Sequence, residues 1–165
     1  MSTLNRCTLE IRRADILSPA VQNLIGALNA ELEGRYPEEG ANHFRLDPEE
    51  LADGRGAFLV AYVGDQPVGC GAVRRIDPAV AEIKRMYVAP EARGRGVGRQ
   101  VLLQLEAEAR RLGATRLLLE TGPRQPEALA LYSRAGFVMI PNFGDYVGCE
   151  FSVCMAKQLT ANIGD

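Results

Sequence analysis

Residues 89–99 read APEARGRGVGR, and this stretch indicates the fold more strongly than any other part of the chain. Glycines alternate at positions 94, 96 and 98, which frees the backbone so that its amides can face a ligand. A helical pattern begins at residue 97, and the first turn of a helix presents unpaired N–H groups and the positive end of the helix dipole. Three arginines add positive charge, so the stretch predicts a phosphate site. The residues expected to form it are Arg93, Gly94, Arg95, Gly96, Val97, Gly98 and Arg99.

Two other phosphate-binding motifs do not match this turn. A Walker loop needs a lysine followed by serine or threonine at the helix start, and neither stands there. A dinucleotide fingerprint needs glycine where Arg99 stands. Glu120 lies about the right distance downstream to bind a ribose, but the antiparallel strands expected upstream are wrong for that fold. The remaining alternative is a flexible turn with solvated arginines.

Apolar periodicity on both sides of the turn predicts a mixed α/β protein of an α+β-like kind. Three consecutive strands joined by short turns precede it and form an antiparallel meander. After the turn, helices alternate with strands. The expected strands are 8–12, 57–63, 68–74, 80–88, 116–120, 137–140 and 147–157, about seven in a central mixed sheet, and the expected helices are 19–34, 47–52, 97–112 and 126–135.

The composition favours one domain, residues 1–165, with a core of about 8–158. The net charge of the 165-residue chain is -2, so no global field favours nucleic acid or an anionic membrane. Four cysteines without a CxxC pair and a single histidine predict no metal site, and they argue against a Ser-His-Asp or Cys-His hydrolase. Because neither a signal peptide nor a membrane-spanning run is evident, we expect a cytoplasmic protein with reduced thiols.

The turn and two further segments resemble the GNAT superfamily of acyl-CoA-dependent N-acyltransferases. Its signature is glutamine or arginine, two residues, glycine, one residue, then glycine or alanine, and Arg93, Gly96 and Gly98 match it in full. Residues 86–90, MYVAP, and 128–137, ALALYSRAGF, look like the family's lead-in strand and its later helix and strand. The resemblance covers nearly the whole chain and implies the GNAT fold with acetyl-CoA as cosubstrate. Gln125 is a departure, because the family often has asparagine there, and it is a further candidate for cofactor binding.

The resemblance implies direct attack of an amine on the acetyl thioester, and it assigns three chemical tasks. Backbone N–H groups of Met86, Tyr87 and Val88 would bind the cofactor and stabilise the developing oxyanion. Tyr132 would give a proton to the leaving thiolate; the alternative is an aromatic packing residue. Glu82 is the first candidate for the base and Glu120 the second, although either could instead be an ion-paired carboxylate.

The resemblance implies an amine acceptor, and we expect the primary amine of a small molecule, because the acidic residues are scattered and indicate no acidic groove for basic protein tails. Residues 35–45 are expected to form a long loop, either a lid over the pocket or a surface connection. Tyr36 and Phe44 from this loop and Tyr146 from a later one are expected to wall the pocket. A cation, Arg85 or Lys84, would suit a carboxylate beside the amine.

Several functional alternatives stay open at this point. The acceptor could instead be a protein or peptide, or the chain could be a catalytically silent acyl-CoA-binding module. Family members commonly form dimers, so the resemblance allows a homodimer. Strand alternation places Glu82, Lys84 and Met86 on one face of their strand and Arg85 on the other, unless a bulge intervenes.

Overall fold

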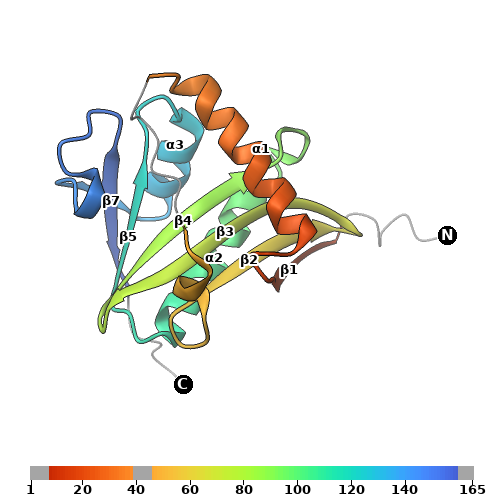
Figure 1. Ribbon diagram of the computed structural model, residues 1–165, viewed down its shortest axis with the longest axis horizontal. Helices are drawn as coiled ribbons and strands as arrows, with labels where there is room; N and C mark the ends of the chain where they lie inside the picture. Colours follow the sequence, from red (N-terminus) through yellow and green to blue (C-terminus); the bar gives the residue numbers. More distant parts are fainter. Residues whose placement is uncertain (1–7, 39–45, 160–165) are drawn as a thin grey trace.

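A computed structural model describes residues 8–38 and 46–159, and its centre is a mixed seven-stranded sheet (Figure 1). The strand order is β1-β2-β3-β4-β5-β7-β6, in which only the β4–β5 pair is parallel. This architecture confirms the mixed α/β expectation. The strands are β1 (Leu9–Arg13), β2 (Gly56–Val63), β3 (Gln66–Asp77), β4 (Val80–Val88), β5 (Arg116–Thr121), β6 (Val138–Ile140) and β7 (Val153–Gln158).

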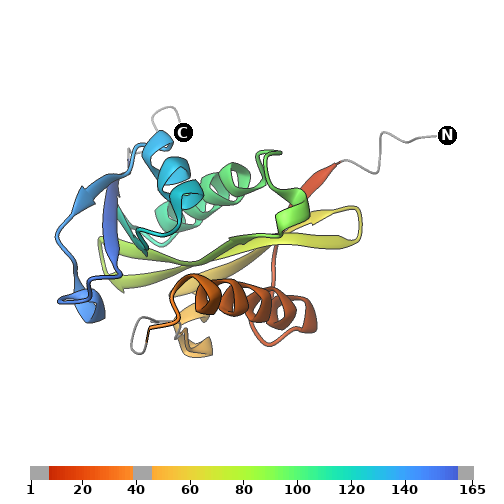
Figure 2. The same ribbon diagram turned by 90° about the horizontal axis from the view of Figure 1, so that it is seen from above.

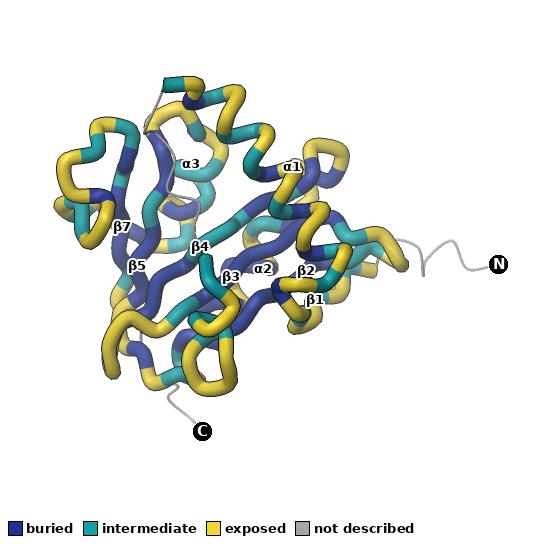
Figure 3. The backbone as a smooth tube through the Cα atoms, in the orientation of Figure 1, coloured by how far each residue is buried: buried dark blue, intermediate teal, exposed yellow. Residues whose placement is uncertain are grey.

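Helices cover both faces of the sheet, with α1 on one face and α2 and α3 on the other (Figure 2). Proline at the first helical position begins α1 and α3, and the left-handed Gly96 precedes α2. The central strands are buried from both sides (Figure 3), because one apolar cluster lies under α2 and a second under α1. The helices are α1 (Pro19–Arg35), α2 (Val97–Arg111) and α3 (Pro126–Arg134), with short 3-10 turns η2 (Pro48–Leu51), η3 (Pro90–Ala92) and η4 (Gly144–Tyr146).

A bulge in β4 changes which face its side chains occupy. Cys70 of β3 pairs with Tyr87, but Ala72 pairs with Lys84, so β4 carries one extra residue between these pairs. Arg85 sits in this bulge with φ 61°, a left-handed conformation that few non-glycine residues adopt. The alternation expected for Glu82, Lys84 and Met86 is therefore broken. Met86 lies against the α2 side, where a Cβ on Gly71 would meet its sulfur, whereas Arg85 reaches Asn29 of α1.

The parallel pair of β4 and β5 opens at its carboxyl end. Ladder pairing in the described chain runs from Val80 and Arg116 to Ile83 and Leu119 and stops there, although both strands continue. Beyond these residues the facing edges of the two strands no longer pair with each other, at the end where the glycine-rich turn follows β4. This gap is where the chain can admit a ligand.

The short helix expected at 47–52 is the 3-10 turn η2, and the largest difference in boundary concerns the last strand. The strand expected at 147–157 begins only at Val153, because η4 and a following turn occupy residues 144–152, and the Asn142 side chain binds the carbonyls of Tyr146 and Cys149. Tyr36 caps the end of α1 and is buried, and most of the loop expected at 35–45, residues 39–45, lies outside the described residues. Phe44 lies outside the described residues. Among the helices that the structure describes, none is long and apolar enough to cross a membrane.

Candidate active site

Two cavities meet where β4 and β5 separate. The larger is a groove of about 690 Å³ bordered by the glycine-rich turn, α2 and α3. The smaller, about 100 Å³, lies between α1, the β4 bulge and the end of β5. Met86, Gln125 and Tyr132 line both, so a molecule in the groove can reach a second molecule in the smaller cavity.

The glycine-rich turn has the geometry of an anion site. Gly94 and Gly96 both adopt φ 79°, and a Cβ built on either would meet no atom within 4 Å. Within the described residues, no backbone carbonyl accepts a hydrogen bond from the amides of residues 94–99. Unpaired amides at the start of α2, facing open space, are the donors that a pyrophosphate requires. The turn thus fits the phosphates of a coenzyme A thioester.

The three arginines of the turn are placed differently. Arg93 borders the groove, but its Nε donates to the carbonyl oxygen of Val88 at 2.9 Å and its Nη2 to Glu31 Oε1 of α1 at 2.6 Å. Arg99 also lines the groove, whereas Arg95 is exposed and lines neither cavity. Every other residue that the sequence assigned to the cofactor lines the groove.

Tyr132 lies at the junction of the two cavities. Its side chain is 5% exposed and packs edge-on against Phe137, with ring centroids 5.9 Å apart. Burial, and to a lesser degree the carboxylate of Glu120, raises the pKa of Tyr132 well above the ordinary phenol value. The hydroxyl therefore stays protonated at neutral pH and is available as a donor. The packing role and the chemical role expected from sequence are compatible.

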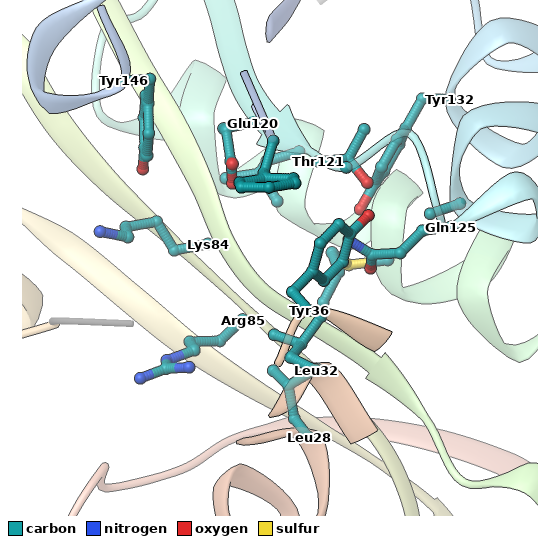
Figure 4. A pocket seen from close by; sticks show the side chains of 15 residues that line it. Leu28, Leu32, Tyr36, Lys84, Arg85, Glu120, Thr121, Gln125, Tyr132 and Tyr146 are labelled. Atoms are coloured by element: carbon teal, nitrogen blue, oxygen red, sulfur yellow. The ribbon is translucent and has the colours of Figure 1, made fainter. Parts of the chain in front are cut away.

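Glu120 lines the smaller cavity at the end of β5 (Figure 4). Burial raises the pKa of this carboxyl to about 7. The hydroxyl of Ser152, which donates to Oε2 at 2.7 Å, lowers the pKa but does not outweigh the effect of burial. A group with a pKa near neutral can exchange a proton under physiological conditions. Ser152 stands 32 residues downstream, and nothing in the local sequence pairs it with Glu120.

Glu82, the first candidate for the base, lies in a different environment. It is 0% exposed and lines neither cavity. Its Oε1 accepts hydrogen bonds from Arg74 Nε at 2.9 Å and Nη2 at 2.8 Å, and its Oε2 accepts one from the hydroxyl of Tyr146 at 2.8 Å. Arg74 also pairs with Glu50. This arrangement is the ion-paired alternative that the sequence left open.

The walls of the smaller cavity include three of the four residues expected to contact the acceptor. Tyr36, Arg85 and Tyr146 all line it (Figure 4), and Phe44 falls outside the described residues. Burial, followed by the Glu82 charge and the hydrogen bond that the Tyr146 hydroxyl donates to Glu82, raises the pKa of Tyr146. The sequence did not assign the remaining wall residues, because separate elements (α1, β4, the end of β5, α3 and the turn before β7) bring them together: Leu28, Leu32, Ile83, Thr121, Gly122, Ala128 and Phe151.

Sequence comparison finds close relatives along nearly the full chain. Residues 22–137 match the Acetyltransferase (GNAT) family. The chain is 42% identical over 150 residues to the IAA acetyltransferase of Azospirillum brasilense, covering 90% of this chain and 97% of that protein. It is 37% identical over 153 residues to the N-acetyltransferase YsnE of Bacillus subtilis strain 168, covering 92% of this chain and 100% of that one.

Comparison with solved structures agrees. A Klebsiella pneumoniae protein assigned as an acyl-CoA N-acyltransferase is 31% identical, with a TM-score of 0.78 over 93% of this chain and 99% of that one. A GNAT acetyltransferase from Elizabethkingia anophelis, solved with acetyl-CoA bound, shares the fold at 20% identity and a TM-score of 0.66, over 92% of this chain and 98% of that one. With its signature turn, its open groove and these relatives, the chain belongs to the GNAT family and is an acyl-CoA-dependent N-acetyltransferase.

Proposed function

We propose that the protein transfers the acetyl group of acetyl-CoA to the primary amine of a small molecule, by direct attack within a ternary complex. The observation that carries this proposal is the junction at Tyr132, where a groove suited to the thioester meets a cavity that contains Glu120. The smaller cavity, about 100 Å³, suits a compact acceptor better than a protein segment. The name of the Azospirillum relative, IAA acetyltransferase, also supports a small-molecule acceptor.

In this proposal Glu120 is the base and Tyr132 is the proton donor. Glu120 takes a proton from the acceptor, directly or through one water, as the amine nitrogen bonds to the thioester carbon. The carbon–sulfur bond breaks, and the hydroxyl of Tyr132 gives its proton to the leaving sulfur. Backbone N–H groups of β4 beyond Ile83, where the ladder with β5 has ended, are the candidates to stabilise the oxyanion. Glu82 serves in this scheme to hold Arg74 and Tyr146 in place.

The test is release of coenzyme A thiol with a panel of small amines, compared among wild type, Tyr132→Phe and Glu120→Gln. Tyr132→Phe should lower kcat by about 10- to 1000-fold, because it removes the proton donor and leaves the ring packing intact. Calorimetric titration with acetyl-CoA should give nearly the wild-type Kd for both variants. Unchanged kcat in Tyr132→Phe would reject its role, and a folded enzyme that binds acetyl-CoA but acetylates no amine would reject the proposed function.

A further inference from the structure

The polar side chains that line the smaller cavity follow one another along its length. In the view of Figure 4, Tyr132 and Gln125 lie at one end, Lys84 and Arg85 at the other, and Glu120 between them. The first end opens onto the groove that fits the thioester. A molecule whose amine faces Glu120 therefore extends its other end toward two cationic side chains.

The β4 bulge places both cations on the α1 side of the sheet. In a regular strand, consecutive side chains point to opposite faces. The extra residue at the bulge instead lets Arg85 donate from Nη1 to Asn29 Oδ1 of α1 at 2.8 Å, while Lys84 lies on the face that holds Glu82 and Glu50. The left-handed φ of Arg85 is an unfavourable conformation for a non-glycine residue. Strain of this kind is commonly retained where it positions a functional group.

The charged side chains on this face favour an anionic ligand. Within the described residues, three cations, Arg74, Lys84 and Arg85, lie near two carboxylates that are fixed by Arg74, namely Glu50 and Glu82. Glu120 offsets these cations only in part at neutral pH, because burial raises its pKa to about 7. Burial also lowers the pKa values of Lys84 and Arg85, which means that a bound anion would stabilise their charged forms.

We propose that the acceptor is a small amine that also carries a carboxylate, as an amino acid does. Its amino group faces Glu120, and its carboxylate lies against Lys84 and Arg85. A guanidinium and an ammonium together suit a carboxylate, because the first offers a planar fork and the second a point charge. This inference rests on the proposed function and narrows its substrate class.

The experiment uses amines in matched pairs, each an amino acid beside its carboxamide, with one, two or three carbons between the amine and the acid. The carboxamide keeps the size and removes the charge. Wild-type kcat/KM should favour at least one amino acid by about 10-fold or more over its carboxamide. Lys84→Met and Arg85→Gln should each lower kcat/KM for that amino acid by about 10- to 100-fold, and for the carboxamide by less than about 3-fold.

Arg116→Met is the matched control, because Arg116 is exposed at the opposite end of β5 from Glu120. It removes one positive charge of the whole protein and should leave both substrates unchanged. If carboxamides are acetylated as well as their amino acids, or if Lys84→Met and Arg85→Gln lower both substrates equally, the inference is wrong while the proposed function stands.

A binding measurement covers the case in which no amine is acetylated, which would reject the proposed function. The probes are N-acetylglycine and N-acetylglycinamide, titrated calorimetrically in the presence of coenzyme A. Tighter binding of N-acetylglycine that Lys84→Met weakens by about 10-fold would support the carboxylate site independently of turnover. Equal binding of the two probes, or no binding of either, would overturn it.

Discussion

Glu120 is a carboxyl group whose ionisation should be visible in the pH dependence of the reaction. Its pKa of about 7 makes it a proton acceptor only above that pH, so wild-type kcat/KM should rise with pH through about 7, in addition to any rise caused by deprotonation of the acceptor amine. Glu120→Gln should lower kcat by about 100- to 10,000-fold. It should also abolish this rising limb of the pH profile of kcat/KM. Initial rates of thiol release between pH 5.5 and 9 measure both.

A stability measurement provides a control that does not depend on turnover. Because the folded-state pKa of Glu120 is raised above the ordinary value of 4.5, the folded chain keeps this proton longer than the unfolded chain does. Stability relative to Glu120→Gln should therefore fall as pH rises from 4.5 through about 7. A flat difference in the free energy of unfolding across that range would mean that Glu120 is an ordinary carboxylate.

Ser152 should set the position of the same limb. Its hydroxyl donates to Glu120 Oε2 at 2.7 Å and stabilises the ionised form, so Ser152→Ala should raise the pKa and move the limb upward by about 1 pH unit. Ser133→Ala, on the exposed face of α3 next to Tyr132, is the control and should leave the limb in place. If Ser152→Ala lowers kcat/KM by the same factor at every pH and leaves the limb in place, the role of Ser152 is structural.

At the scale of single residues, the sequence identified the candidate groups but not their environments. Tyr132 and Glu120 were found because a family motif and a strand end point to them. The ranking of Glu82 above Glu120 rested on distance along the chain from the turn, whereas cavity access depends on Arg74 and Tyr146, which contact Glu82 from separate elements. Ser152 was missed because only the pairing of β5 with β7 and the turn before β7 bring it to Glu120.

The contact between α2 and the β4 bulge depends on a glycine of β3. A Cβ on Gly71 would approach Leu105 Cδ1 to 2.7 Å and Met86 Sδ to 2.8 Å, inside a packed cluster. Gly71→Ala should therefore destabilise the fold by about 1–3 kcal/mol. It should also weaken catalysis, because Met86 lines both cavities. Urea denaturation measures the change in the free energy of unfolding, provided that the slope of this free energy against urea concentration is the same in both proteins.

Gly26→Ala is the control for that substitution. Gly26 lies inside α1, and a Cβ there meets nothing within 4 Å, so alanine should stabilise the helix by about 0.5–1 kcal/mol. Equal and small effects at the two glycines would show that the cluster around Met86 can relax, and that the bulge is less tightly held than its contacts indicate.

At the scale of elements, strong periodicity was sufficient for most of the fold. The helix expected at 97–112 and the strands of the meander were right to within about three residues, because their apolar faces and turn glycines are local signals. No local sequence pattern predicts the β4 bulge, because the extra residue is defined only by the pairing of β4 with β3. The late boundary of β7 follows from side-chain bonds of Asn142 that hydrophobicity does not indicate.

The arrangement of the whole molecule brings α1 to one wall of the cofactor groove, which Leu28, Glu31 and Arg35 line. Glu31 of α1 binds Arg93 of the turn, and Arg35 binds Glu127 of α3 at 2.8 Å, so ion pairs link α1 to two of the elements that border the groove, the turn and α3. Carboxylates beside a site for a polyanion oppose its binding. Arg93, expected from the signature to contact the phosphates, is engaged by Glu31 at 2.6 Å.

Glu31→Gln should consequently strengthen acetyl-CoA binding by about 2- to 5-fold at low ionic strength, because it releases Arg93 from a partly exposed ion pair and removes a nearby negative charge. The gain should shrink at 0.5 M salt, where charges are screened over short distances. Glu33→Gln changes the net charge equally on the exposed face of the same helix and should leave Kd unchanged. Calorimetric titration of acetyl-CoA into both variants separates the release of Arg93 from the change in net charge.

An equal gain in affinity for Glu31→Gln and Glu33→Gln would assign the change to net charge. No gain in affinity for Glu31→Gln would mean that Arg93 orders the turn through Val88 without contacting the cofactor.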